Sequence, residues 1–133
     1  MSHRTVMAPD EPTSRLLRLA LVLGGLSGAL GVALMAMSAH VDTTGLVKTA
    51  AEMLLFHAPA LVVMGAVIQV RRAPLLPVAL GFLTLGLTLF CGDLISRAFL
   101  EQRLFPMAAP SGGLFLIAGW VTVLLASLRI AAR

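Results

Sequence analysis

The sequence predicts an all-α protein, an integral membrane four-helix bundle with both termini in the cytoplasm, and three observations lead to this prediction. The 133 residues are 59% hydrophobic and 12% charged, with a mean hydropathy of +0.97, whereas soluble domains are about 45–50% apolar and about 25% charged. The apolar residues form four runs of about 20–25 residues, the length at which a helix crosses a hydrocarbon core of about 30 Å. The basic residues that flank these runs are divided unevenly between the two predicted sides.

The first predicted span covers about residues 16–39 and follows a polar head over residues 1–15, which we expect to be flexible. Arg15 and Arg18 at the start of the run, with Ala36-Met37-Ser38 near its end, leave a cleaved signal peptide as an alternative. The apolar region of a signal peptide is about 7–15 residues long, and this run is longer. We therefore favour a helix that is retained in the membrane.

Three further spans are predicted at about residues 49–70, 75–99 and 111–130, which gives a transmembrane domain over residues 16–133. Backbone N–H and C=O groups in lipid have to be satisfied within their own segment, so each span is expected to be a helix. The breaks between the spans carry turn-forming or helix-breaking residues, from Asp42 to Gly45, from Arg71 to Pro74 and from Pro106 to Pro110.

Basic residues set the predicted orientation, because cytoplasmic segments of membrane proteins carry an excess of Lys and Arg. With four spans, the N-terminus, the second loop and the C-terminus share one side, and the first and third loops share the other. The first side holds Arg4, Arg15, Arg18, Arg71, Arg72, Arg129 and Arg133, and the second holds Lys48, Arg97 and Arg103. Both termini are therefore predicted to lie in the cytoplasm.

The ionisable residues within and beside the spans lie toward the outer side in this orientation, and they form a candidate polar cluster of His40, Glu52, His57, Asp93 and Arg97. A charge at the middle of a span costs about 2.5–3.5 kcal/mol on insertion scales, so such residues usually face the bundle interior and have a partner. The i, i+4 spacing of Asp93 and Arg97 predicts an ion pair along one helix face. Glu52 follows Lys48 at the same spacing near a helix N-terminus, which predicts a surface ion pair.

His57 is expected to lie deeper, about 12 Å along its helix. Pro59 has no N–H, so it frees the carbonyl of Leu55 as an acceptor inside the bundle. A neutral imidazole can donate a hydrogen bond to this carbonyl or to a neighbouring helix. Structural hydrogen bonding is the leading interpretation of His57, with proton handling and metal or cofactor ligation as the alternatives.

The sequence predicts no catalytic site, no metal site and no cofactor, and it indicates that the protein is not an enzyme. His40 and His57 are the pair that two axial haem ligands would require, but they differ in depth by about two helical turns. No two potential ligands are close enough in sequence for a zinc site, and the single Cys91 cannot form an internal disulfide. The basic residues separate apolar segments and form no patch, so we expect no nucleic acid partner.

Small residues are the expected means of helix packing, because lipid supplies no hydrophobic drive between helices. The glycines predicted to lie at helix contacts are Gly24, Gly28, Gly31, Gly81, Gly92, Gly112 and Gly113. The first three form a stripe along the first span, and the last two follow Pro110 and predict a tight entry into the fourth span. Trp120 lies near the middle of that span, where we expect it to pack in the core or in a protein groove.

Four stretches together resemble a known family: GALGVALMAMSAH at residues 28–40, FHAPAL at 56–61, LFCGDL at 89–94 and PSGGLFLIAGW at 110–120. They are similar to motifs of the small YgdD-like membrane proteins, called domain of unknown function 423, whose relatives include transmembrane protein 256. The resemblance covers about residues 20–128 and implies a four-helix membrane protein. It places His40, His57, Gly112, Gly113 and Trp120 at motif positions of the family, and it implies no established activity.

Three functions are compatible with the sequence. The favoured one is a structural or accessory protein of the bacterial inner membrane, which packs beside larger membrane proteins or copies of itself in the lipid bilayer. The alternative is an oligomeric transporter or proton- or ion-handling protein that uses the outer polar cluster. A second alternative is a quinone- or haem-binding redox subunit.

Overall fold

A computed structural model describes residues 13–130, and this part of the chain is built from four helices. They are α1 (Arg15–Val41), α2 (Leu46–Val70), α3 (Leu76–Leu100) and α4 (Ala108–Ser127). Each helix is long and apolar enough to span a membrane, which confirms the predicted all-α bundle of four candidate spans. Residues 1–12, most of the predicted polar head, and residues 131–133 lie outside the described part.

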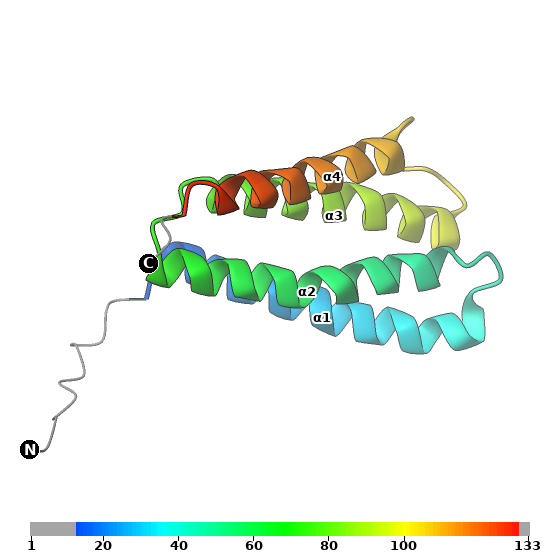
Figure 1. Cartoon of the computed structure of the whole chain (residues 1–133). Coiled ribbons are helices and arrows are strands. Elements are labelled where there is room, and N and C mark those ends of the chain that lie inside the picture. Colours follow the sequence, from blue (N-terminus) through cyan, green and yellow to red (C-terminus); the bar gives the residue numbers. More distant parts are fainter. Residues whose placement is uncertain (1–12, 131–133) are drawn as a thin grey trace, which may run out of the picture.

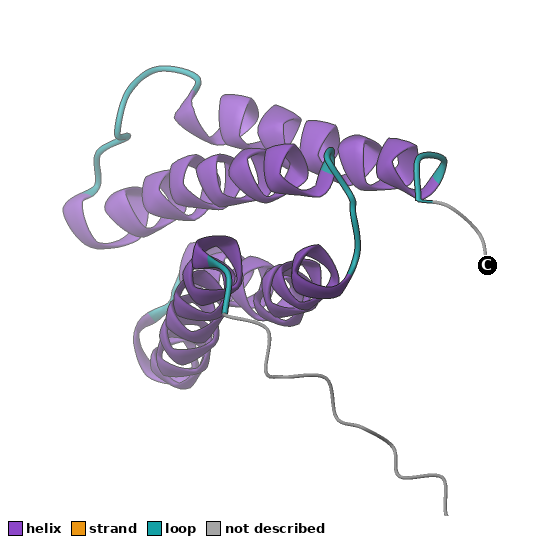
Figure 2. Cartoon of the chain, turned by 90° about the vertical axis from the view of Figure 1, so that its left-hand side faces the viewer, coloured by secondary structure: helices purple, strands orange, loops and turns teal. Residues whose placement is uncertain are grey.

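The helices form two antiparallel hairpins, α1 with α2 and α3 with α4, which meet mainly through α2 and α3. The start of α1 and the end of α4 lie at the same end of the bundle (Figure 1), as an even number of spans requires. The two hairpins cross each other instead of running parallel (Figure 2). Because α1 meets α3 over only a short stretch, the bundle is open along that side.

Local hydrogen bonding explains where the helices begin. The side chain of Ser14 accepts the N–H of Leu17 at 3.0 Å and caps α1. The carboxylate of Asp42 accepts the N–H of Lys48 at 2.8 Å, so the first turn of α2 is capped and the helix begins before the predicted residue 49. The last helix also begins earlier than residue 111, because Pro110 lies in its first turn, where a helix needs no N–H from that residue.

Glycine lets α1 and α2 approach each other closely. A Cβ added at Gly24 would lie 2.9 Å from the carbonyl oxygen of Ala58, and one added at Gly31 would lie 2.7 Å from Cγ of Leu55. Gly28 faces the same helix at a looser 3.7 Å from the Cβ of Ala58. The predicted stripe of small residues on α1 therefore lies against α2.

The contact between α3 and α4 is equally close. A Cβ added at Gly112 would lie 2.5 Å from the backbone nitrogen of Phe90 and 2.9 Å from the carbonyl oxygen of Gly86. Both neighbours are backbone atoms, so a side chain at Gly112 has no flexible group to displace. The backbones of α3 and α4 thus touch near the start of α4.

The remaining predicted packing glycines lie elsewhere. A Cβ added at Gly81 or Gly113 would meet no atom within 4 Å, so neither residue marks a helix contact within the described chain. A Cβ at Gly92 would meet Cδ1 of Leu104 at 3.1 Å, and this neighbour belongs to the α3–α4 loop. Gly92 therefore accommodates a loop side chain and not a neighbouring helix.

The core lies between the hairpins, where Leu61 of α2 and Leu83 of α3 are 1% and 0% exposed. In the most apolar window of each helix, 44% of α3 is buried but only 28% of α1 and of α4, so α3 is the central helix. The outer faces of α1 and α4 carry large apolar side chains such as Val22 and Leu124, which are 64% and 66% exposed. A bilayer would cover these faces with hydrocarbon.

Candidate functional site

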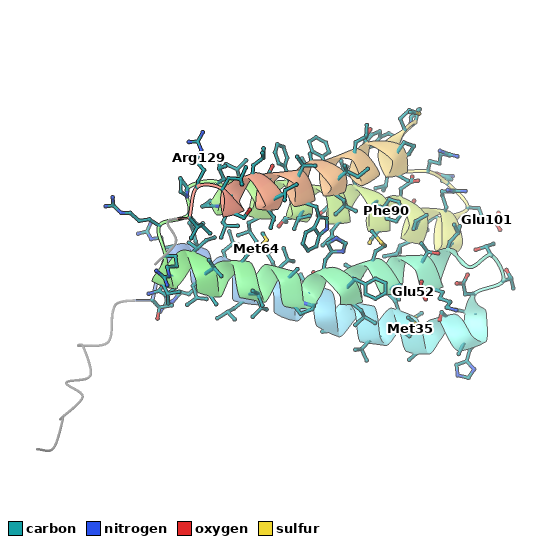
Figure 3. All side chains as sticks on the ribbon, viewed as in Figure 1. Met35, Glu52, Met64, Phe90, Glu101 and Arg129 are labelled. Atoms are coloured by element: carbon teal, nitrogen blue, oxygen red, sulfur yellow. The ribbon has the colours of Figure 1, made fainter. Side chains whose placement is uncertain are left out.

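The five residues of the candidate polar cluster do not meet at one site. His40 is exposed in the last turn of α1. Glu52 pairs with Lys48 at 4.0 Å on the surface of α2, as their spacing predicts. Glu52 and Glu101 lie toward the end of the bundle opposite Arg129 (Figure 3). The ionisable residues of the candidate cluster therefore make separate contacts and form no single site.

His57 is held between the two hairpins by both ring nitrogens. The side chain is 6% exposed, and Nδ1 lies 2.7 Å from the carbonyl oxygen of Met53, one turn back on α2. Nε1 of Trp120 donates to Nε2 of His57 at 3.1 Å, and the two rings are 5.8 Å apart. Since Nε2 accepts a hydrogen bond, Nδ1 carries the proton and donates it to Met53, so the ring is the neutral tautomer. The acceptor of His57 is therefore Met53 on its own helix, and neither the carbonyl of Leu55 nor a group on a neighbouring helix, the two acceptors considered from the sequence.

Trp120 is the partner that reasoning from the sequence did not assign to His57. His57 lies about 17 Å from the start of α2 and Trp120 about 18 Å from the start of α4, and these two helix starts are at the same end of the bundle. The sequence signal that could have predicted this pair is that His57 and Trp120 lie at nearly the same depth in their spans. The sequence does not predict which faces of α2 and α4 point toward each other, because both helices are apolar on all sides.

Asp93 holds the α3–α4 loop, residues 101–107, against α3. The residue is 0% exposed and lies about 10 Å before the end of its helix. Its Oδ1 accepts the N–H of Leu104 at 3.0 Å, while Ser96 donates its hydroxyl to the carbonyl oxygen of Gln102 at 2.7 Å. The loop therefore folds back along the last turns of α3 and does not extend away from the bundle.

The predicted ion pair of Asp93 with Arg97 is wrong. In the range that the structure describes, ion pairing is found only between Lys48 and Glu52, and Oδ2 of Asp93 is buried with no hydrogen-bond partner. The backbone N–H of Leu104 is the donor that Asp93 receives instead. The first and last residues of the loop, Glu101 at φ 55° and Met107 at φ 70°, are left-handed and let the chain change direction at these points.

No group of three or more His, Cys, Asp or Glu side chains among residues 13–130 is placed to hold a metal ion. Both nitrogens of His57 are engaged, and His40 lies at the rim of the bundle. The thiol of Cys91 points to the carbonyl oxygen of Ala50 at 3.6 Å, which links α3 to α2.

An apolar groove of ≈ 230 Å³ runs along the open side of the bundle between α1 and α3, with α2 at its base. Leucines from all three helices form its walls, including Leu26 and Leu30 of α1 and Leu87 of α3. Ser27 and Cys91 also line it. Gly92, one of the lining residues toward the end of α3, lies against Leu104 of the α3–α4 loop.

Comparison with known proteins finds a family and several relatives. A sequence profile for the family described as "Protein of unknown function (DUF423)" matches residues 27–113. The chain is 32% identical over 120 residues to UPF0382 inner membrane protein YgdD of Escherichia coli strain K12, and the match covers 85% of this chain and 92% of that protein. Proteins of the same name from Escherichia coli O157:H7 and Shigella flexneri match with the same identity and coverage. No solved structure matches the chain.

Proposed function

Because the chain belongs to the DUF423 family of proteins of unknown function and is a multi-pass protein of the inner membrane, we propose that it is an accessory protein that packs against other transmembrane helices. Its partner is a second copy of the chain or a larger membrane protein. The proposal rests on one exposed face of α1 that carries small residues.

This face consists of Gly25, Ala29, Ala33 and Ala36, all of them exposed. The first three are spaced four residues apart and so lie in one row along the helix. A Cβ added at Gly25 would meet no atom within 4 Å, in contrast to Gly24, which packs against α2. Rows of small residues at this spacing let two membrane helices approach until their backbones touch, which is how helices associate where lipid supplies no hydrophobic drive.

The separation of the polar groups supports an accessory role over a catalytic one. His57 is bonded to Met53 and Trp120, Glu52 to Lys48, and Asp93 to the α3–α4 loop. A catalytic site needs a nucleophile or base within hydrogen-bond reach of a group that orients it. These contacts instead fix helices and a loop in place.

We further propose that both termini of the protein face the cytoplasm. The end of the bundle where α1 begins and α4 ends carries Arg15, Arg18, Arg71, Arg72 and Arg129. The opposite end carries Lys48, Arg97 and Arg103. This excess of basic residues is typical of the cytoplasmic side of an inner-membrane protein.

The association is tested by purification in a mild detergent, followed by native mass spectrometry of the complex. The unaltered chain is expected to run as an oligomer or with a membrane partner, and Gly25→Leu is expected to reduce that species because the side chain holds the helices apart. Gly113→Leu is the matched control, since Gly113 also faces open space but lies on α4. A monomer without partners, or equal loss in both variants, would contradict the proposal.

One observation favours a second candidate, a proton- or ion-handling protein. Asp93 is 0% exposed, and its Oδ2 has no partner among residues 13–130, which leaves one carboxylate oxygen able to take a proton or a cation. Ionisable residues inside membrane spans often mark ion pathways. Flux through reconstituted vesicles would then fall in Asp93→Asn and in His57→Ala, and unchanged flux in both variants would remove this candidate.

A further inference from the structure

One hydroxyl group that lines the groove between α1 and α3, that of Ser27, makes no hydrogen bond to the described chain. Ser27 lies near the middle of α1, about 18 Å from its start, and is 8% exposed where it lines the groove. Its hydroxyl makes no hydrogen bond within residues 13–130. Among these residues Oδ2 of Asp93 is the one fully buried side-chain oxygen or nitrogen without a partner, so the hydroxyl oxygen of Ser27 keeps some accessible surface.

Five other hydroxyls within the membrane helices behave differently. Ser38, Thr84, Thr88, Thr122 and Ser127 each donate to a backbone carbonyl three or four residues earlier, at distances of 2.6–2.8 Å. The thiol of Cys91, which also lines the groove, points to the carbonyl of Ala50. Ser27 therefore supplies the free donor of the groove.

We propose that this groove binds a neutral, lipid-soluble molecule that carries a carbonyl group, of the quinone class, and that Ser27 donates a hydrogen bond to the carbonyl oxygen. A hydroxyl group donates to such an oxygen without any change in protonation. The inference does not depend on association through Gly25, because Gly25 is not part of the groove.

The polar contact is what distinguishes such a ligand from bulk lipid. Hydrocarbon tails are as apolar as leucine, so the leucine walls alone give no preference for a ligand over the surrounding bilayer. A hydrogen bond made away from water provides that preference. The ester carbonyls of phospholipids lie at the membrane interface, whereas Ser27 is at mid-span, so the fitting ligand carries its carbonyl within the hydrocarbon core.

The size of the groove agrees with one ring or a short chain. Its volume of ≈ 230 Å³ exceeds the roughly 150 Å³ of an apolar cavity that binds benzene, so it can hold a substituted six-membered ring. Because Leu104 lies against Gly92 toward the end of α3, we expect a longer tail to leave sideways between α1 and α3. The half-exposed Leu26 and Leu30 would cover that tail.

The test is an equilibrium titration of the purified chain in lipid nanodiscs with decylubiquinone, and with decylbenzene as the probe that lacks carbonyls. Decylubiquinone should bind saturably, and Ser27→Ala should weaken its binding about 3- to 10-fold, the effect of one neutral hydrogen bond. Ser38→Ala is the matched control, because the hydroxyl of Ser38 already donates to Met35 and lies outside the groove. Decylbenzene should bind weakly and equally to the unaltered chain and to Ser27→Ala.

A photoreactive analogue of decylubiquinone gives a second readout that does not rely on affinity. Its adducts should map to residues 23–30 of α1 and 84–95 of α3, which line the groove. Ser27→Leu, which fills the groove, should abolish these adducts, while the variant keeps its helical circular dichroism. No saturable binding to the folded chain, equal affinity in Ser27→Ala, or adducts on α4 would each overturn the proposal.

Discussion

The hydrogen bond between His57 and Trp120 is the residue-scale contact that ties the two hairpins together in the middle of the bundle. It joins α2 to α4, which belong to different hairpins. The bond to Met53 fixes the tautomer of the ring and thereby presents Nε2 as an acceptor. We infer that this pair sets how far the hairpins are turned relative to each other.

A double-mutant cycle with His57→Leu and Trp120→Phe measures this contact. Each single variant should lower the free energy of unfolding, because the partner that remains is left without its hydrogen bond away from water. The coupling energy should be about 0.5–1.5 kcal/mol, as for other hydrogen bonds between membrane helices. The measurement is denaturant unfolding in detergent micelles, and additive effects of the two substitutions would contradict the contact.

Asp93 provides a second residue-scale prediction, since its two oxygens have different surroundings. Asp93→Asn keeps an oxygen for the N–H of Leu104 and buries a neutral group, so the free energy of unfolding should stay unchanged or rise. Asp93→Ala leaves the N–H of Leu104 without its acceptor and should lower the free energy of unfolding by about 1–3 kcal/mol. Hydrogen exchange at the Leu104 amide should accelerate in the alanine variant alone, and equal loss of stability in both variants would contradict this role.

The i, i+4 spacing within a helix predicted one ion pair correctly and a second one wrongly. The i, i+4 rule gave the pair of Lys48 and Glu52 correctly, and both side chains lie on the surface of α2. The same rule failed for Asp93 and Arg97, because a loop residue eleven positions further along supplies a backbone N–H. Ser27 was not predicted either, since a missing hydrogen bond leaves no trace in sequence.

At the scale of single helices, the start of α4 depends on glycine at residue 112 and not at residue 113. Gly112→Ala would push a methyl group into backbone atoms of Phe90 and Gly86, so it should lower the free energy of unfolding by about 1–3 kcal/mol. Gly113→Ala meets open space and should raise it by up to about 1 kcal/mol through helix propensity. Thermal unfolding of the two variants in the same detergent compares them directly, and equal effects would refute the backbone contact.

The first turn of α2 has a predicted pH dependence that comes from Asp42, which lies in the α1–α2 loop. Hydrogen bonds, chiefly from the N–H of Lys48 and also from Thr44, lower the pKa of this carboxylate from its ordinary value of 3.8. A group with a lowered pKa stabilises the folded state above the unfolded value and loses this effect as the pH falls through the folded value. The window therefore lies below pH 3.8.

The measurement is hydrogen-exchange protection of the Lys48 amide as a function of pH. Protection should fall below pH 3.8 in the unaltered chain. In Asp42→Asn it should not depend on pH over this range, because the amide cannot titrate. Constant protection in the unaltered chain would show that Asp42 does not cap α2.

The existence of the helices could be predicted from the sequence, and their ends only in part. Hydropathy located all four spans, because a run of apolar residues of this length has one stable conformation in lipid. The helix starts differ from the predicted ones because hydropathy does not report local effects at helix ends. Asp42 caps α2, and Pro110 is accommodated in the first turn of α4. The stripe from Gly24 to Gly31 was read correctly as a packing face, whereas Gly81 and Gly113 face open space.

At the scale of the whole molecule, the arrangement of the hairpins could not be predicted. Each helix is apolar on all sides, so no polar face reveals which side lies inward. The pairing of α1 with α2 and of α3 with α4 follows from short loops, but the crossing of the hairpins depends on side-chain contacts such as Trp120 with His57. The open groove between α1 and α3 results from that crossing.

The central claim is that four helices cross the inner membrane with both termini on the cytoplasmic side, and single-cysteine labelling tests it most directly. Cys91 is the sole cysteine of the sequence, so Cys91→Ala gives a background to which Thr43→Cys or Arg72→Cys is added. A membrane-impermeant maleimide applied to intact spheroplasts should label Thr43→Cys in the α1–α2 loop, and it should label Arg72→Cys in the α2–α3 loop only after permeabilisation. Labelling of Arg72→Cys in intact spheroplasts, or protection of Thr43→Cys, would contradict the claim.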